Sequence, residues 1–432
     1  MEIASFLLFF LLILIVLSGY PVALVLGGLS VIVGYIYVPD FLDLLPLRIM
    51  GVMENQVLIA VPLFIYMGLM LEKSGLAETL LETMALLFGK VRGGLAISVM
   101  LVGALLAAST GIVGATVVTM GLISLPVMLK NGYRPELATG VIASSGTLGQ
   151  IIPPSVVLVI LGSVMNVSVG SLFKAALIPG VLLVVMYLIY IAVHALVKPE
   201  DAPPLHNQNS QSTIGKRVSA GSVFMAFLLP IMLMAAVLGS IYTGIASPTE
   251  AAGIGALGAM FLALSQSRLT WRVLKDVSRE TSILCAMIFL ILLGATTFSL
   301  VFRGMGGEKY LVEWVASSQL SPIMFLLLAM SVVFLAGFFI DFIEIVFIFV
   351  PIIAPVCIAF KMDLVWVGIL LALNLQTSFL TPPFGFSLFY LKGVAPKSIT
   401  TAILYKGIIP FLLIQLLLLL LILVFPQILF YR

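Results

Sequence analysis

The chain has 432 residues, of which 62% are hydrophobic and only 9% are charged, and its formal net charge is +3. Soluble domains carry about 25% charged residues, and one water-soluble core of this length cannot bury so much apolar surface. The composition therefore excludes a cytosolic enzyme, a disulfide-stabilised secreted domain and a nucleic-acid-binding domain. It predicts an all-α polytopic membrane protein, with the bilayer as its solvent.

Apolar runs long enough to span a bilayer, which takes about 20 residues, follow one another along the chain. Simple spans are expected near 3–20, 22–38, 56–72, 171–197, 223–242, 249–266, 282–302 and 404–425. Ser247-Pro248-Thr249-Glu250 has the form of a capping box with proline at the first helical position. It predicts a helix start rather than a functional role for Glu250.

Two long apolar segments, residues 93–129 and 321–360, are each interrupted near their centre. The interruptions fall at Ser109-Thr110-Gly111 and around Ile340-Asp341-Phe342. Each segment is expected to be a re-entrant helical hairpin that enters and leaves the membrane on one side. Two full crossings per segment would leave the flanking charges on the same side, so charge alone does not decide how deep the tips lie.

Two other segments, residues 137–165 and 364–391, are long enough to span but carry adjacent prolines halfway, Pro153-Pro154 and Pro382-Pro383. Proline removes a backbone donor and pushes the residue before it out of helical geometry. Freed backbone groups are costly in hydrocarbon, so a break persists only where protein, water, an ion or a substrate satisfies them. Two broken helices are therefore expected.

Lysine and arginine predict the orientation, because basic residues are retained on the cytoplasmic side. If the base of the first hairpin, flanked by Lys90, Arg92, Lys130 and Arg134, is cytoplasmic, only six of the 21 basic residues fall outside. These six are Arg48, Lys174, Arg303, Lys309, Lys361 and Arg432. Both chain termini are then expected on the periplasmic side, and the second hairpin opens to the outside.

The polar stretch 199–218 is predicted to be a cytoplasmic linker between two inverted repeats, residues 1–198 and 219–432. Three pairs of features recur at offsets of 227, 232 and 229 residues: Pro21 and Pro248, Ser109 and Asp341, and Pro153 and Pro382. Because the two hairpins open to opposite sides, the halves are antiparallel. Inverted repeats with broken helices are typical of secondary transporters that bind their substrate near the bilayer midplane.

Each repeat is expected to contain the same succession of elements. The first comprises scaffold helices within 1–72, an interfacial arm helix at 74–89, the hairpin 93–129, the broken helix 137–165 and a helix at 171–197. The second comprises scaffold helices within 223–302, an arm helix at 305–320, the hairpin 321–360, the broken helix 364–391 and a helix at 404–425.

Hydroxyl and amide side chains cluster around each break. They are Ser144, Ser145, Thr147 and Gln150 in the first half, and Asn374, Gln376, Thr377, Ser378 and Thr381 in the second. Carbonyl and hydroxyl oxygens suit a hard cation such as sodium, and helix N-termini attract an anionic group. The clusters therefore indicate an ion-coupled carrier.

Two carboxylates lie in the apolar stretch of the second hairpin, Asp341 and Glu344. Carboxylates are costly in a membrane and usually face a cavity or a partner, and residues three apart share a helix face. One or both are expected to bind a cation or to titrate. Glu344 could instead pair with a basic residue of a neighbouring subunit or point into a wet crevice.

Three stretches together resemble one family. GTLGQIIPPS at 146–155, AASTGIVGATVVTMGLISLPVMLKNGYRPELATG at 107–140 and NLQTSFLTPPFGFSLF at 374–389 are similar to the large membrane subunit of tripartite ATP-independent periplasmic (TRAP) transporters. The likeness extends along essentially the whole chain. It implies an elevator-type, ion-transporter-superfamily-like fold in a bacterial or archaeal inner membrane, and import of an organic acid by sodium symport. It also implies two partners, a small four-helix membrane subunit and a periplasmic substrate-binding protein.

The same resemblance implies specific site residues. The first sodium site would comprise Ser109, Gly111, Ser145, Thr147 and Gly149, and the second Gly337, Asp341, Thr377 and Thr381. The organic anion would lie between the tips, near Thr110, Gln150, Pro153, Pro154, Glu344, Ser378, Pro382 and Pro383. Many members of the family carry small residues after the second-hairpin aspartate, whereas this chain has Phe342-Ile343-Glu344.

Two other functions are alternatives to a tripartite transporter subunit. The nearest is a sodium-coupled anion carrier of the same architecture that works without a binding protein. The other is an intramembrane enzyme, but the sequence contains neither HExxH nor GxSxG, and neither histidine lies deep in a span. No enzymatic activity is therefore expected.

Overall fold

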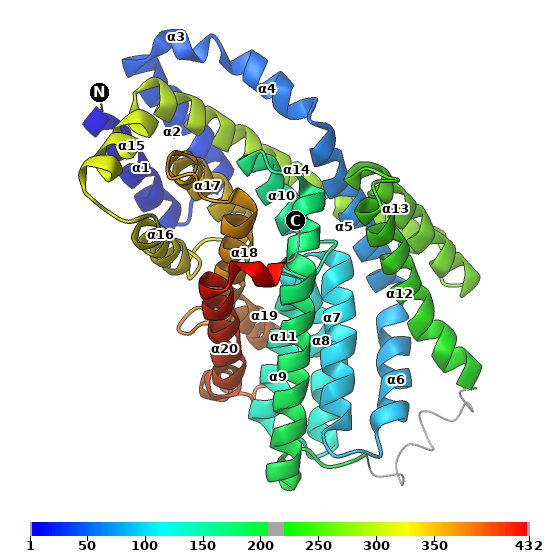
Figure 1. The fold of residues 1–432 in the computed structure, drawn as a ribbon. Helices are drawn as coiled ribbons and strands as arrows, with labels where there is room; N and C mark the ends of the chain where they lie inside the picture. Colours follow the sequence, from blue (N-terminus) through cyan, green and yellow to red (C-terminus); the bar gives the residue numbers. More distant parts are fainter. Residues whose placement is uncertain (1, 206–219, 430–432) are drawn as a thin grey trace.

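The computed structural model describes residues 2–205 and 220–429, and over these ranges its regular structure is entirely helical (Figure 1). Seven of the described helices are long and apolar enough to cross a membrane. Large apolar side chains are exposed on outer faces, as on the last helix, where Leu413, Leu417 and Leu420 are exposed by 60%, 48% and 55%. The predicted all-α polytopic membrane fold is confirmed. Residues 206–218 of the predicted linker lie outside the described residues.

The first half of the chain contains two short helices that hydropathy did not predict, α3 and α4. Its elements are α1 (Glu2–Leu17), α2 (Val22–Tyr37), α3 (Pro39–Leu42), α4 (Leu45–Met53), η1 (Gln56–Ile59), α5 (Ala60–Lys73), α6 (Leu76–Phe88), α7 (Gly94–Thr110), α8 (Val113–Lys130), α9 (Pro135–Thr147), η2 (Leu148–Gln150), α10 (Val156–Met165), α11 (Val169–Val197) and η3 (Pro199–Asp201).

The second half contains one helix that is much longer than expected, α14. Its elements are α12 (Ala220–Tyr242), α13 (Pro248–Ser265), α14 (Trp271–Gly304), α15 (Gly307–Ser317), α16 (Pro322–Ala336), α17 (Phe342–Ala359), α18 (Leu364–Leu380), α19 (Phe386–Val394), α20 (Thr401–Val424) and η4 (Pro426–Leu429). The capping box at the start of α13 is confirmed. Ser247 Oγ accepts from Glu250 N at 3.3 Å, and the Glu250 carboxylate accepts from Ser247 N at 2.7 Å.

Both helical hairpins are present. The arms α7 and α8 turn at Gly111, whose φ of +63° suits glycine, and α16 and α17 turn between Gly337 and Asp341. At 1.5 Å per residue, the 15 residues of α16 extend only about 22 Å. That is shorter than a hydrocarbon core of about 30 Å, as expected of a re-entrant arm.

Both predicted helix breaks are confirmed. In the first half, α9 and η2 end before Ile151, and α10 begins at Val156 after the cis peptide bond Pro153–Pro154. In the second half, α18 ends at Leu380, and α19 begins at Phe386 after the cis bond Pro382–Pro383. We refer to residues 151–155 as break 1 and to residues 381–385 as break 2.

The contacts between helices repeat in an exchanged order, as a twofold relation between the halves requires. Helix α5 packs on α13, and its counterpart α14 packs on α2, the counterpart of α13. In the same way α10 packs on α17 while α19 packs on α8, and α20 packs on α9 while α11 packs on α18. These pairs support the inverted-repeat fold. The boundary between the repeats stays a prediction.

The helices form two groups. The framework group consists of α1, α2, α5, α12, α13 and α14, and the hairpin group consists of α7 to α11 and α16 to α20. Helices α6 and α15 lie where the two arm helices were expected. Each bridges the groups: α6 packs on α5, α12 and α7, and α15 packs on α1, α14 and α17. Figure 1 shows α6, α7 and α11 side by side in the lower part of the molecule.

The chain leaving α11 packs against the base of the first hairpin. Gly93 N donates to Ala202 O at 2.9 Å, Arg134 N donates to Asp201 O at 2.9 Å, and Leu205 N donates to Gly89 O at 2.8 Å. The first residues of the predicted linker therefore lie on the same side of the molecule as the hairpin base.

Candidate functional site

The crossing of the two halves brings both tips and both breaks into one region. Helix α9 packs along the hairpin of its own half, α7 and α8, but α10 crosses to α17 of the other half. Conversely, α18 packs on its own hairpin arms α16 and α17, while α19 crosses to α8. Neither half can therefore form the central region alone.

The tip of the first hairpin lies directly on break 1. A Cβ added to Gly111 would meet Val156 N, the start of α10, at 3.1 Å, and one added to Gly149 would meet Ala107 O at 2.1 Å. A Cβ at Gly103 would meet Ser145 Oγ at 2.3 Å. Approaches this close, to the Ser145 side chain and to the Ala107 backbone, require glycine at positions 103 and 149. The structure thus places Gly111 against the start of α10, and it places Ser145 and Gly149 against α7.

The hydroxyls of this region bond to the backbone of their own helices. Ser145 Oγ donates to Ile142 O at 3.0 Å, and Thr147 Oγ1 donates to Ser144 O at 2.9 Å. The Thr110 and Thr116 hydroxyls bond to each other at 2.8 Å and hold the hairpin tip together. Each oxygen keeps a lone pair that can accept or ligate.

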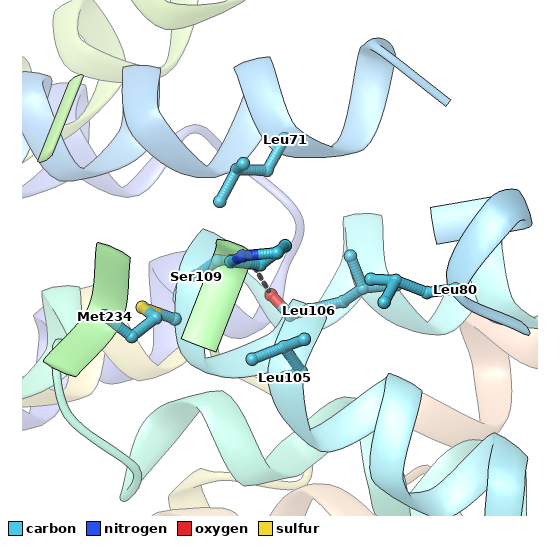
Figure 2. A pocket seen from close by; sticks show the side chains of 7 residues that line it. Leu71, Leu80, Leu105, Leu106, Ser109 and Met234 are labelled. Carbon is cyan, nitrogen blue, oxygen red and sulfur yellow. Dashed lines mark hydrogen bonds between the residues drawn. The ribbon is translucent and has the colours of Figure 1, made fainter. Parts of the chain in front are cut away.

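Ser109 faces the framework group rather than break 1. Its Oγ donates to Leu106 O at 2.8 Å, and its side chain lines a pocket of about 10 Å³ with Leu71, Leu80 and Met234 (Figure 2). A Cβ at Gly68 of α5 would meet Ser109 O at 2.4 Å. The tip of the first hairpin is therefore in close contact with α5, and the Ser109 hydroxyl is not directed at Ser145 or Thr147.

The second hairpin is tied to α18 by side chains instead. Ser378 Oγ donates to Phe334 O at 2.6 Å, and Asn374 Nδ2 donates to Met330 O at 2.8 Å. Gly337 allows this approach, since a Cβ there would meet Ser378 Oγ at 2.4 Å. Thr377 and Thr381 each donate to a carbonyl one turn earlier in α18, at 2.7 and 2.8 Å.

Asp341 caps α17 at the second tip. Its Oδ1 accepts from Phe342 N at 2.7 Å, and Glu344 follows one turn later. Both carboxylates are half-buried, and neither forms an ion pair with a basic side chain among the described residues. Two unpaired acids at a helix N-terminus provide oxygen atoms and negative charge for a cation.

Two of the buried glutamines that have no hydrogen-bond partner among the described residues lie beside the breaks, one in each half. Gln150 in η2 and Gln376 in α18 have no exposed surface, and neither the amide N nor the amide O of either side chain has a partner. An unsatisfied buried polar group costs about 1–3 kcal/mol. Because α18 contacts η2, both amides lie in the region of the breaks, where a bound molecule could satisfy them. Sequence reasoning noted Gln376 but gave it no role.

Tyr390 of α19 packs on the first tip and was not expected at the site. A Cβ at Gly114, in the first turn of α8, would meet the Tyr390 ring at 3.1 Å. The same phenol lies within electrostatic reach of Asp341 and Glu344. The crossing of α19 to the other half places it there, and no motif marks it in the sequence.

The two proline pairs lie in different surroundings. Pro153 and Pro154 are buried, whereas Pro382 is half-buried and Pro383 is exposed. Tyr405 of α20 donates a hydrogen bond to Pro383 O. Beside break 2, the Phe339 and Phe384 rings lie 4.9 Å apart and are exposed by 53% and 54%. Break 2 is open to its surroundings and break 1 is covered.

Comparison with known proteins gives one consistent relationship. The profile of the family described as "Tripartite ATP-independent periplasmic transporter, DctM component" matches residues 8–428. The C4-dicarboxylate TRAP transporter large permease protein DctM of Pseudomonas aeruginosa is 31% identical over 93% of this chain and 91% of its own length. The ectoine TRAP transporter large permease protein TeaC of Halomonas elongata is 30% identical over 96% of this chain and 95% of its own length.

A solved structure shows the same fold. The YdaH transporter of Alcanivorax borkumensis, described as having an unusual topology, superposes with a TM-score of 0.64 over 98% of both chains, at 14% identity.

Proposed function

Because this chain belongs to the tripartite ATP-independent periplasmic transporter family as its DctM component, we propose that it imports an organic acid by sodium symport through an elevator mechanism. The observation that carries the proposal is the meeting of two hairpin tips and two broken helices, with unpaired carboxylates and unpartnered amides between them. The chain contributes binding and movement, and no covalent chemistry. We propose that the protein resides in the bacterial inner membrane.

Sodium coupling is supported by the chemistry of the two tips. Hydroxyl and carbonyl oxygens at break 1 and the Asp341 carboxylate at the second tip are hard ligands, which suit a hard cation. A sodium ion beside Asp341 would neutralise the carboxylate and reduce repulsion of an incoming anion. Substrate and sodium would therefore bind together, and a half-loaded hairpin group would cross the membrane poorly.

The elevator mechanism is supported by how the two groups meet. The hairpin group meets the framework group mainly along two helices, α5, which packs on α7 and α10, and α14, which packs on α17. The contacts include Gly68 on the first tip and the hydrogen bond from Thr119 of α8 to Glu72 of α5. With two inverted repeats, each repeat can adopt the conformation that the other has in this structure, which opens the site to the other side of the membrane. In that state break 1 would be open and break 2 covered. The hairpin group would slide along α5 and α14.

The proposed partners and cargo follow the relatives. Matching proteins are named for C4-dicarboxylates, ectoine and sialic acid, and C4-dicarboxylates are the first cargo to test. A periplasmic binding protein would deliver the substrate, and a small four-helix subunit would stand beside the framework group. We place both chain termini in the periplasm, by the distribution of lysine and arginine.

The test is transport in proteoliposomes containing this chain together with the small subunit and the binding protein proposed as its partners. With an inward sodium gradient we expect uptake of a labelled C4-dicarboxylate that collapses when choline replaces sodium. Uptake that persists without sodium would refute the coupling. Omitting the binding protein tests the rival carrier, because undiminished uptake without it would show that the chain works alone.

A further inference from the structure

We propose that a basic pocket at the shared ends of α9, α11 and α20 binds the phosphate headgroup of an anionic phospholipid. The pocket has a volume of about 280 Å³, and its polar lining comprises Arg134, Glu136, Tyr190, His194, Lys198 and Lys406. It lies at the hairpin base, on the side predicted to be cytoplasmic. It is separate from the tips and breaks.

Two acidic groups at this pocket, Glu136 in its lining and Asp201 beside it, are already paired. Arg134 holds Glu136 Oε2 at 3.1 Å and Asp201 Oδ2 at 3.4 Å, and His194 Nε2 lies 3.0 Å from the same Asp201 oxygen. Lys198 and Lys406 are exposed and form no ion pair among the described residues. Two ammonium groups therefore remain to attract an anion from two different helices.

The walls of the pocket suit a lipid better than a soluble anion. Leu137, Gly407 and Pro410 complete the lining. Beside them on α11 and α20, Val193 and Ile409 are exposed by 51% and 47%. A headgroup between the lysines would have its acyl chains against this apolar surface. Basic pockets between membrane helices on the cytoplasmic side bind phospholipid headgroups in this way, since that leaflet is rich in anionic lipid.

The pocket also joins three helices of the hairpin group at one end. A lipid held there would bridge Lys198 at the end of α11 and Lys406 at the start of α20, which are far apart in the chain. Because all three helices belong to the hairpin group, the bound lipid would move with that group. It would differ in this respect from the lipids that surround the protein without a specific site.

The experiment measures cardiolipin binding to the purified full chain by native mass spectrometry. Removing both lysines, in K198Q/K406Q, should weaken cardiolipin binding about 10- to 30-fold, since a basic residue near an anionic lipid surface contributes about 1 kcal/mol. The matched control K275Q/K397Q removes two exposed lysines outside the pocket and should change binding less than twofold. K198R/K406R keeps both charges and should retain binding.

Several results would overturn the proposal. Unchanged binding in K198Q/K406Q, equal loss in K275Q/K397Q, or phosphatidylcholine binding as tightly as cardiolipin would each refute a specific anionic-lipid site. Inorganic phosphate that displaces cardiolipin at equal concentration would show that the pocket takes a soluble anion instead. Thermal unfolding of each variant, measured alongside, should match wild type, and loss of binding in K198R/K406R would refute the dependence on charge.

Discussion

The two breaks are alike in sequence but are held in different ways. Break 1 is packed by backbone against backbone through Gly111 and Gly149, and its prolines are buried. Break 2 is held by the side chains of Asn374 and Ser378, and its prolines are partly or fully exposed. The candidate site is therefore covered at break 1, its covered wall, and open at break 2, its open wall. A carrier whose site is accessible from one side of the membrane requires such a difference.

The largest effect is expected at the open wall. Asp341→Asn removes the charge of the proposed sodium ligand, which is worth about 1.5–3 kcal/mol, so the sodium concentration for half-maximal uptake should rise about 10- to 150-fold. Sodium titration of uptake in proteoliposomes measures it. Glu344→Gln is the comparison. If Glu344→Gln raised the sodium concentration for half-maximal uptake more than Asp341→Asn did, Glu344 rather than Asp341 would be the sodium ligand.

The next largest effect is expected on stability, where substitutions should cost more at break 1, packed by backbone, than at break 2, held by side chains. Gly149→Ala would put a methyl group 2.1 Å from Ala107 O and should cost about 1–3 kcal/mol of stability. Ser378→Ala loses one hydrogen bond, worth about 0.5–1.5 kcal/mol. Thermal unfolding in detergent should rank them in that order. Gly28→Ala should not destabilise, since the added Cβ would have no described atom within 4 Å beyond the backbone of its own helix. Destabilisation by Gly28→Ala would show that the assay reports something other than packing.

Replacing the unpartnered amides should have a smaller effect, which raises stability and lowers uptake. Gln376→Leu and Gln150→Leu remove buried unsatisfied groups and should raise the unfolding temperature. Uptake should fall about 2- to 12-fold, through loss of the hydrogen bond that each amide is proposed to make to the bound substrate, worth about 0.5–1.5 kcal/mol. Gln415→Leu on α20 is the control. Its amide is equally buried and unpartnered, but it is not at a break. Equal loss of uptake in Gln415→Leu would argue against a role for the other two amides.

The smallest effect is expected at Tyr390, which packs on the first tip. Tyr390→Phe keeps the ring that packs on Gly114 and removes only the hydroxyl near Asp341 and Glu344. Uptake should fall less than about tenfold, in line with one neutral hydrogen bond, and the affinity for substrate should change more than the affinity for sodium. A change confined to sodium affinity would place the hydroxyl at the ion rather than at the anion.

The hairpins and breaks could be predicted because proline pairs and small-residue tips leave a mark in an apolar sequence. Helix α14 could not be delimited, since Lys275, Asp276, Arg279 and Glu280 lower the hydropathy of its first turns without preventing a helix. Helices α3 and α4 were missed for a related reason, because each is too short for a spanning window.

The arrangement of the site was harder to predict than its location. The polar residues near the breaks are evident from sequence, but the direction of each side chain depends on how the two halves cross. Ser109 faces α5, and Tyr390 reaches the opposite hairpin, because of packing between segments far apart in the chain. Gln376 stands out only once its lack of a partner is known.

The crossing of α10 onto α17 has a consequence for biosynthesis. Ribosomes add about 5–20 residues per second, so α10 waits roughly 10–35 s after its own synthesis before α17 begins to emerge. During that interval the polar face of break 1 lies in the bilayer without its final neighbour. The nascent chain therefore needs temporary shelter, from the insertion machinery or from water, until the later half arrives.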